Sequence, residues 1–408
     1  ANDGKSYKVT IDANNSYNAR ESYVKFVTTE IKDEEDKDLT VRVYFEQDCL
    51  PSVKYSISMY DAEFDTWGTT ALSNAVFNGK HYVSNGQDLY EIDPATGNYS
   101  KISWPWGSGM TQRVITNDDA GNLIVCNHTA YLNDAYTDGY FILNVVTPAG
   151  VESNLITKAA WECGGPFGGK IAVTGDVTSN AVICAPVEGI VDVTGSNSIG
   201  CWEVTNGTVG EYNKIAVTGV VCIGWMPGNW CVYPTNCPQF IPQGVHVSDG
   251  FLMSGCYEEN TVYAVAPNGE AIKMLTPELM VDGYDLNGNL GCQSIGEVMI
   301  GSDVYVGILG SPFFPSYGPG WSGAPYLSIF KVPATLPSTP LNMWEDANVV
   351  KICTSYFPWE DDPATDWGID VFADIKLYNA DGKIGVTVAD LNGRCIEAYE
   401  FDPEVIKK

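Results

Sequence analysis

The sequence predicts an all-β chain in which one four-stranded unit occurs six times. A strand followed by a tight turn with Pro, Asn or Gly recurs at a nearly constant period, in residues 89–94, 143–148, 202–207, 262–267, 328–333 and 398–403. The 408 residues are 45% hydrophobic and include 41 Gly and 22 Pro, a composition typical of many short strands joined by turns. Self-similarity at such a long period indicates a repeat architecture.

Each recurring strand is preceded by two further strand-like runs. They cover 71–77 and 81–83, 112–116 and 123–126, 170–174 and 181–184, 244–247 and 251–254, 295–300 and 304–309, and 372–377 and 383–388. Asn-Gly and Asp-Gly signals between the runs favour short hairpin connections. A four-stranded sheet cannot bury both faces alone, so repeated meanders close into a β-propeller. We therefore predict a six-bladed β-propeller over residues 50–408, with seven blades as the competing count.

The two ends of the predicted ring are incomplete in complementary ways. The last repeat has little chain left for an outer strand, whereas residues 53–60 form a strand with no blade of their own. We expect 53–60 to complete the sixth blade, which would hide two open sheet edges. Before it, runs at 7–11, 23–31 and 39–45 predict a small, partial Ig-like β module over residues 1–49, short of the roughly seven strands of a sandwich.

Charge excludes several classes of partner. Lys and Arg number 22 against 51 Asp and Glu, a formal net charge of -29, so nucleic acid and an anionic membrane surface would be repelled. No run of 18 apolar residues occurs. We expect a soluble monomer, trimmed from a longer precursor.

The twelve cysteines show neither a Cys-x-x-Cys pair nor the ligand spacing of structural zinc. Cys126 and Cys184 fall at matching places in successive repeats, which favours buried free thiols that act as small hydrophobes. Cys231 and Cys237 share one irregular loop and would form a local disulfide in an oxidising compartment.

Strand parity places the long loops on one face of the ring. In an up-and-down blade, the second-to-third strand loops and the blade-to-blade loops leave the same end of the sheet. These loops carry most of the tryptophans, and loops on a rigid frame commonly hold binding residues. Aromatic faces beside amides and carboxylates suit sugar rings. The predicted ligand-binding residues are Trp104, Trp106, Trp161, Trp225, Trp230, Tyr233, Phe314, Tyr317, Trp321, Trp359 and Trp367.

Packing between blades is the competing interpretation for some of these rings. Trp67, Trp106 and Trp367 are each followed by Gly and precede an innermost strand, a position that suits burial. Trp104, Trp225, Trp230, Trp321 and Trp359 lie deeper in irregular loops, where exposure is favoured.

The alternative of a glycan-cleaving enzyme depends on acidic residues of the long-loop face, because glycosidases use two carboxylates at a fixed distance. The candidates are Asp61, Glu63, Asp65, Glu162, Glu345, Asp346, Glu360, Asp361, Asp362 and Asp366. Surface acids in loops are more often simply solvated. Of the three histidines, His81 and His246 lie in predicted strands and are expected in the core or lining the channel.

A Gly-rich loop offers oxygen ligands for one metal. Asp282, Asp285, Asn287 and Asn289 could hold Ca²⁺, although the terminal Glu of a calcium loop is missing. No other cofactor is expected.

Two stretches carry a family resemblance. Residues 15–26 and 39–47 resemble the closing half of BACON-type Ig-like modules of Bacteroidetes surface proteins, and residues 169–183 with 202–207 resemble a blade of propeller-bearing lipoproteins from the same bacteria. The resemblance implies an outer-membrane surface or periplasmic protein of glycan-foraging bacteria, anchored by an N-terminal lipid on a cysteine that this chain does not contain.

Together these observations predict non-catalytic binding of a polysaccharide or glycoprotein glycan on the long-loop face. A glycan-cleaving hydrolase or lyase that uses loop carboxylates, and a protein-docking scaffold or adhesin, remain the alternatives.

Overall fold

The computed structural model describes residues 20–32, 38–47, 52–59, 61–62, 64, 72–110, 113–127, 140–159, 171–187, 197–218, 244–247, 250–254, 262–274, 280–281, 284–285, 290–312, 326–332, 336, 348–351, 373–390 and 395–406. The chain divides into two compact units, Ala1–Ser52 and Val53–Lys408. In the described part of the chain, no helix is long and apolar enough to cross a membrane.

The described residues of the first unit form one antiparallel hairpin. Strands β1 (Arg20–Lys32) and β2 (Asp38–Gln47) pair from Arg20↔Gln47 onward, with a register shift between Thr28 and Lys32. The run expected at 7–11 lies outside the described residues. Two strands do not amount to an Ig-like fold, so that part of the prediction is not confirmed.

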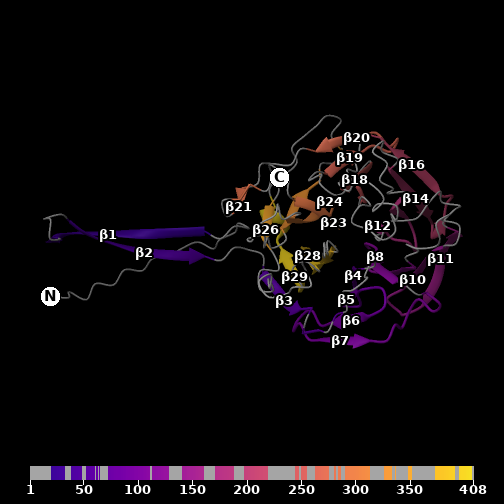
Figure 1. Cartoon of the computed structure of the whole chain (residues 1–408), viewed down its shortest axis with the longest axis horizontal. Helices are drawn as coiled ribbons and strands as arrows, with labels where there is room; N and C mark the ends of the chain where they lie inside the picture. Colours follow the sequence, from indigo (N-terminus) through magenta and orange to yellow (C-terminus); the bar gives the residue numbers. More distant parts are fainter. Residues whose placement is uncertain are drawn as a thin grey trace, which may run out of the picture. The chain divides into compact units, whose positions relative to one another are not determined.

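The second unit is a six-bladed β-propeller, as the repeats predict. Figure 1 shows six small sheets arranged around a centre in sequence order. The first blade comprises β4 (Ser73–Phe77), β5 (Lys80–Ser84), β6 (Leu89–Ile92) and β7 (Tyr99–Ile102). The second comprises β8 (Arg113–Asn117), β9 (Leu123–Asn127), β10 (Tyr140–Val146) and β11 (Glu152–Ala159). The third comprises β12 (Ala172–Gly175), β13 (Ala181–Val187), β14 (Asn197–Thr205) and an interrupted outer strand, β15 (Thr208–Val209) and β16 (Asn213–Val217).

The remaining blades repeat the same antiparallel meander. The fourth comprises β17 (Gly244–Val247), β18 (Gly250–Ser254), β19 (Val262–Val265) and β20 (Ala271–Met274). The short pair β21 (Met280–Val281) and β22 (Tyr284–Asp285) follows. The fifth comprises β23 (Leu290–Ile300), β24 (Asp303–Pro312), β25 (Tyr326–Lys331) and β26 (Asn348–Lys351). The sixth begins with β27 (Ala373–Ala380), β28 (Lys383–Asp390) and β29 (Cys395–Phe401), before a final 3-10 turn, Pro403–Val405.

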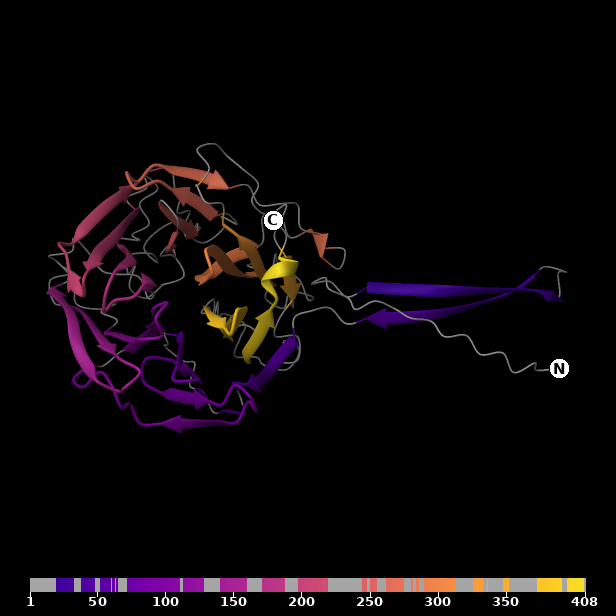
Figure 2. The same cartoon turned by 180° about the vertical axis from the view of Figure 1, so that it is seen from behind.

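The sixth sheet takes its outer strand from the start of the ring. Its order is β27-β28-β29-β3, where β3 is Ser52–Ser58. Figure 2 shows the indigo β3 beside the yellow strands of the last blade. Pairing of chain segments so far apart in sequence covers two sheet edges that would otherwise remain open.

The recurring sequence motif is the third strand of every blade. Its apolar positions are buried because both faces of each sheet pack against neighbouring blades; Leu89 and Ile92 of β6, for example, are fully buried. Between the second and third blades, Trp202 stacks on Phe141 with ring centroids 4.8 Å apart and nearly parallel planes. Such contacts, rather than any blade alone, form the core.

Polar side chains tie neighbouring innermost strands together. The amide N–H of Val76 in β4 donates to Asn117 Oδ1 at 2.9 Å, and the amide N–H of Asn74 donates to Asp374 Oδ2 at 2.6 Å. An innermost strand has a free edge toward the channel, and these side chains satisfy backbone groups that the sheet leaves unpaired.

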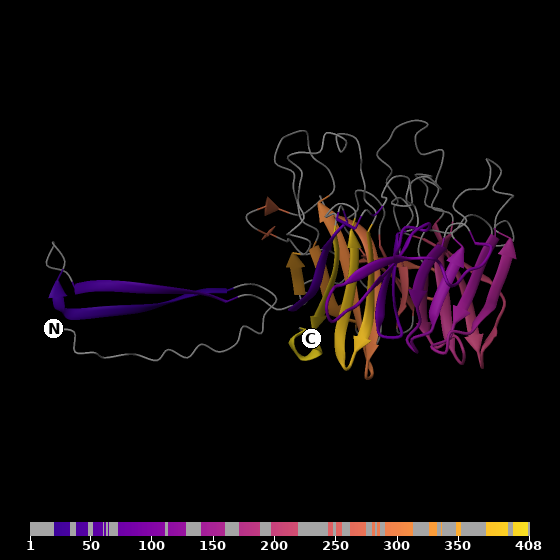
Figure 3. The ribbon, with the colours of Figure 1, turned by 90° about the horizontal axis from the view of Figure 1, so that it is seen from below.

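The short turns meet at one end of the blades. Asn78 Nδ2, in the first-to-second strand turn of the first blade, donates to Pro148 O in the third-to-fourth strand turn of the second at 2.9 Å. The amide of Gly207 likewise donates to Ser179 O at 2.7 Å. Figure 3 shows the strands running between the two ends of the ring. These contacts confirm that the two short-turn classes share an end.

The described cysteines agree with the expectation for the repeats. Cys126 and Cys184 are buried free thiols, and so is Cys201. Burial raises the pKa of the Cys126 thiol well above its ordinary value, so this thiol is unreactive. Cys395 is disulfide-bonded. Cys231 and Cys237 lie outside the described residues.

Candidate functional site

Two of the eleven predicted ligand-binding residues, Trp104 and Trp106, lie in the described part of the chain. Both belong to the connection between the first and second blades, and both are half-buried. The other nine lie outside the described residues: Trp161, Trp225, Trp230, Tyr233, Phe314, Tyr317, Trp321, Trp359 and Trp367.

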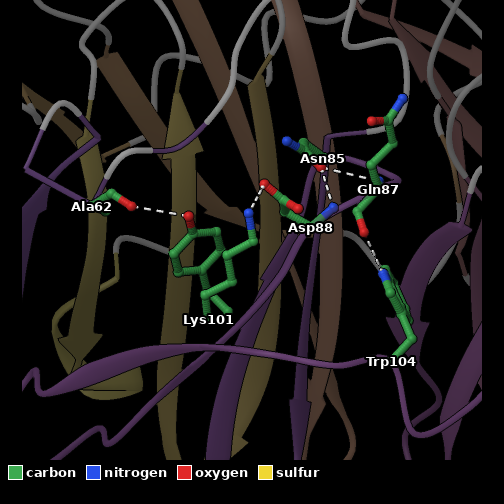
Figure 4. Close-up of polar contacts among 7 residues, drawn as sticks. Ala62, Asn85, Gln87, Asp88, Lys101 and Trp104 are labelled. Atoms are coloured by element: carbon green, nitrogen blue, oxygen red, sulfur yellow. Dashed lines mark hydrogen bonds and ion pairs between the residues drawn. The ribbon is translucent and has the colours of Figure 1, made fainter.

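Trp104 is held at the long-loop end of the first blade. Its indole Nε1 donates to Gln87 O at 2.7 Å (Figure 4). Gln87 belongs to the second-to-third strand loop, whereas Trp104 belongs to the blade-to-blade connection. The bond therefore shows, for this blade, that the two long-loop classes emerge together, as strand parity predicts.

The loop that accepts this bond is held by hydrogen bonds of its own. Asn85 Oδ1 accepts the amide N–H groups of Gln87 at 3.0 Å and Asp88 at 2.6 Å, which is an Asx turn. Lys101 Nζ lies 2.6 Å from Asp88 Oδ2, an exposed ion pair that contributes little by itself (Figure 4). The turn fixes the carbonyl that orients the indole.

Arg113 covers part of the indole ring. Its guanidinium carbon lies 4.7 Å from the Trp104 ring centroid, within cation–π range. The same side chain donates through Nε to Gly107 O at 3.1 Å. Burial lowers the pKa of Arg113, and nearby Glu152 opposes that effect. An arginine guanidinium stays protonated in proteins, so Arg113 places a positive charge over one side of the aromatic group.

Trp106 belongs to the core rather than to the rim. Its ring meets Phe77 edge-on at 5.5 Å and Tyr82 edge-on at 5.6 Å, inside the cluster between the first two blades. This is the packing arrangement expected for a Trp-Gly pair before an innermost strand. Its predicted ligand-binding role has no support from these contacts and stays an untested prediction.

The rim of the first blade thus presents an oriented half-buried indole with polar groups around it. The Arg113 guanidinium lies over the ring and the Gln87 carbonyl accepts its N–H, while the same loop also carries the exposed Gln87 side chain and the Asp88 carboxylate, which pairs with Lys101. We call this group, with Trp104, the Trp104 rim. Sequence reasoning missed its polar members, although an Asn-Gly-x-Asp turn opposite a Trp-rich connection was a usable signal.

Most of the predicted loop acids lie outside the described residues. Asp61 is described and exposed, and its amide donates to Ser58 Oγ at 3.3 Å. The others, Glu63, Asp65, Glu162, Glu345, Asp346, Glu360, Asp361, Asp362 and Asp366, are not described. Among the histidines, His81 is 1% exposed and lies in the core, as expected.

The predicted calcium loop is only partly described. Asp285 ends strand β22, whereas Asp282, Asn287 and Asn289 lie outside the described residues. Within the described ranges, no group of three His, Cys, Asp or Glu side chains is arranged to hold a metal ion. Calcium binding at this loop stays a prediction.

Fold and rim together define a six-bladed β-propeller with an aromatic and polar loop end. The chain belongs to the family described as a domain of unknown function, DUF8500, which matches residues 94–339. No curated protein matches the sequence significantly.

Solved structures of several different proteins are similar to this chain at low sequence identity. Penicillium chrysogenum α-L-arabinanase complexed with arabinobiose is 9% identical (TM-score 0.42), covering 87% of this chain and 98% of its own. Trypanosoma rangeli sialidase in complex with the inhibitor DANA is 9% identical (TM-score 0.43), covering 94% and 60%. The Neurospora crassa Pan2 WD40 domain is 8% identical (TM-score 0.36), covering 86% and 95%. At these values the likeness concerns the fold and bears on no ligand or activity.

Proposed function

We propose that the protein binds a polysaccharide or glycoprotein glycan at the long-loop end of the propeller, without cleaving it. The observation that carries the proposal is the fixed orientation of Trp104, whose indole N–H is held by Gln87 O at 2.7 Å. A ring oriented before binding loses little conformational freedom when a ligand stacks on it.

The groups around the ring suit a sugar. Axial C–H groups of a pyranose stack on an aromatic surface, while its hydroxyls need planar donors and acceptors, here Arg113 over the ring and the exposed Gln87 side chain of the adjoining loop. Because the chain carries a net charge of -29, a neutral or basic glycan suits this surface better than a strongly anionic one.

The test is a glycan array with the full chain, followed by isothermal titration of the best ligand against Trp104→Ala. We expect affinity to fall by about tenfold, because stacking and hydrogen bonding on one aromatic anchor contribute on the order of 1–2 kcal/mol. Tyr99→Ala is the matched control, since Tyr99 is exposed on the outer strand of the same blade, where it neighbours Tyr90 rather than the rim.

The predicted rings outside the described residues extend the same test. Trp230→Ala and Trp321→Ala should also weaken binding if the long loops form one surface. Equal affinity in all three variants would refute the proposed site. Release of new reducing ends from the bound glycan would instead favour the hydrolase alternative, and an array without hits would favour a protein-docking role.

Location at the outer-membrane surface or in the periplasm, with a lipid anchor outside this chain, is part of the proposal. The disulfide at Cys395 supports it, because disulfides persist mainly in oxidising compartments. Protease shaving of intact cells that express the native precursor tests the surface location. Protection from the protease together with recovery in the cytosolic fraction would contradict it.

A further inference from the structure

A cavity lies against the innermost strands at the centre of the propeller. Its walls are mainly aliphatic residues of β8, β12, β23 and β27. Five polar side chains interrupt these walls: Ser73, Thr116, Glu297, Asp374 and Lys376. The Trp104 rim contributes none of the lining residues.

Glu297 is the least satisfied of these side chains. It is 5% exposed, and its Oε1 accepts the hydroxyl of Thr174 at 3.1 Å. Its Oε2 is buried and has no hydrogen-bond partner among the described residues. Burial raises the pKa of Glu297 to about 8, Asp119 acts in the same direction, and Lys376 opposes both. The carboxyl group is therefore mostly protonated at neutral pH and has an unused hydrogen-bonding position.

Lys376 also keeps unused hydrogen-bonding capacity. Its Nζ donates to Asn117 O at 2.7 Å, across from the sixth blade to the second. An ammonium group has three protons, so two stay available, and no carboxylate of the described residues forms an ion pair with it.

Two of the other polar side chains are occupied by structural bonds. Asp374 Oδ2 accepts the amide of Asn74 at 2.6 Å, and Ser73 Oγ accepts the amide of Ile115 at 3.0 Å. Glu297, Lys376 and the Thr116 hydroxyl are left to meet a cavity occupant.

The charges select the chemistry of that occupant. A bare cation would be repelled by Lys376, and a bare anion would meet Asp119 and a chain of net charge -29. A hydroxyl group both donates and accepts, so it fits a carboxyl group in either protonation state as well as an ammonium group. We propose that this cavity binds a small neutral polyol, whose hydroxyls bridge Glu297 Oε2 and Lys376 Nζ. The proposal is independent of the Trp104 rim.

Ligand-observed saturation-transfer NMR on the full chain at pH 7 tests the proposal, with glycerol as the probe and 1-propanol as the matched control. We expect transfer to glycerol and not to 1-propanol, and about tenfold weaker glycerol binding in Lys376→Met, because hydrogen bonds to charged groups are the stronger ones. Glu297→Gln, which keeps the hydrogen-bonding capacity, should stay within about twofold of the wild type. Thermal shift is unsuitable, since glycerol stabilises most proteins by exclusion from their surface.

Absence of transfer to glycerol in the wild type would mean that water alone fills the cavity, and would overturn the proposal. Equal glycerol affinity in Lys376→Met would overturn it as well. Thr116→Val, which removes one hydroxyl at nearly constant volume, supplies a second variant if Lys376→Met does not fold. Trp104→Ala should leave glycerol binding unchanged, so failure of this site and failure of the rim are distinguishable.

Discussion

The hydroxyl oxygen of Tyr55 lies 2.7 Å from Nδ1 of His81 at the joint where the ring closes. Tyr55 belongs to β3, the outer strand of the sixth blade, and His81 belongs to β5 of the first blade. The imidazole also meets Tyr378 of the sixth blade edge-on, with centroids 5.2 Å apart. One buried imidazole thus contacts the closing blade through two different strands.

We expect acid to weaken the contact between the first and sixth blades at His81, and so to lower the free energy of unfolding. Burial lowers the pKa of His81 to about 4, below the ordinary 6.5, so the folded protein keeps the ring neutral while the unfolded chain takes up a proton. Stability contributed by His81 is present above pH 6.5 and is lost as pH falls through about 4, by up to about 1.4 kcal/mol per pH unit. Urea unfolding at pH 7, 5.5 and 4.5 measures this loss.

The control for the acid effect is His81→Phe, which cannot titrate. Its unfolding free energy will be lower at pH 7, but its loss between pH 7 and 4.5 should be smaller than that of the wild type. Parallel curves for the two proteins would assign acid sensitivity to other groups.

Raising the pH should also destabilise the protein, in this case through Glu297. Because its folded pKa, about 8, lies above the ordinary 4.5, the folded protein binds the extra proton. The stability contributed by this group is fully present below pH 4.5 and is lost as pH rises through about 8. Denaturant unfolding at pH 6, 7.5 and 9 measures the decline. Glu297→Gln should flatten it, and an unchanged slope in that variant would contradict the assignment.

The sequence predicted those features of the fold that depend on short-range patterns of apolar and turn residues. The third strand of each blade and the strand at 53–60 show apolar alternation and flanking turn residues in the sequence itself, and these set the order of the strands. Parity then placed Trp104 at the long-loop end. The bond of its indole to Gln87 O confirms this placement.

Contacts between blades could not be predicted in the same way. Asn74 and Asp374 are 300 residues apart, and Thr174 and Glu297 are 123 apart, so no local pattern joins them. Their polar character inside runs expected to be apolar was the available signal. Trp104 and Trp106 are two residues apart in one loop and both pack against the cluster between the first two blades, yet their other neighbours differ: Arg113 covers Trp104, whereas Phe77 meets Trp106 edge-on.

Those two tryptophans should respond differently to truncation. Trp106→Ala removes a ring packed edge-on against Phe77 and Tyr82 and should cost roughly 2–4 kcal/mol of unfolding free energy. Trp104→Ala removes one indole bond and a cation–π contact near the surface, for a cost of about 1–2 kcal/mol. Equilibrium denaturation of both variants makes the comparison. A larger loss for Trp104→Ala would show that the rim, too, is chiefly structural.

Among the described glycines, Gly269, in the turn between β19 and β20, leaves the least room for a Cβ. Its φ of +88° is a left-handed conformation, and a Cβ there would press against Ala216 O of the third blade. The same turn accepts the amide of Thr218 through Gly269 O at 2.9 Å, so it cannot move away without losing that bond. We expect Gly269→Ala to destabilise the protein by more than about 3 kcal/mol, because the steric clash with Ala216 O adds to the 1–2 kcal/mol cost of the left-handed backbone conformation.

Gly301→Ala is the matched control. Its φ is +65° in another hairpin turn and nothing lies within 4 Å of the added Cβ, so only the conformational cost remains. Equal melting temperatures for the two variants would show that the third and fourth blades separate freely at this turn.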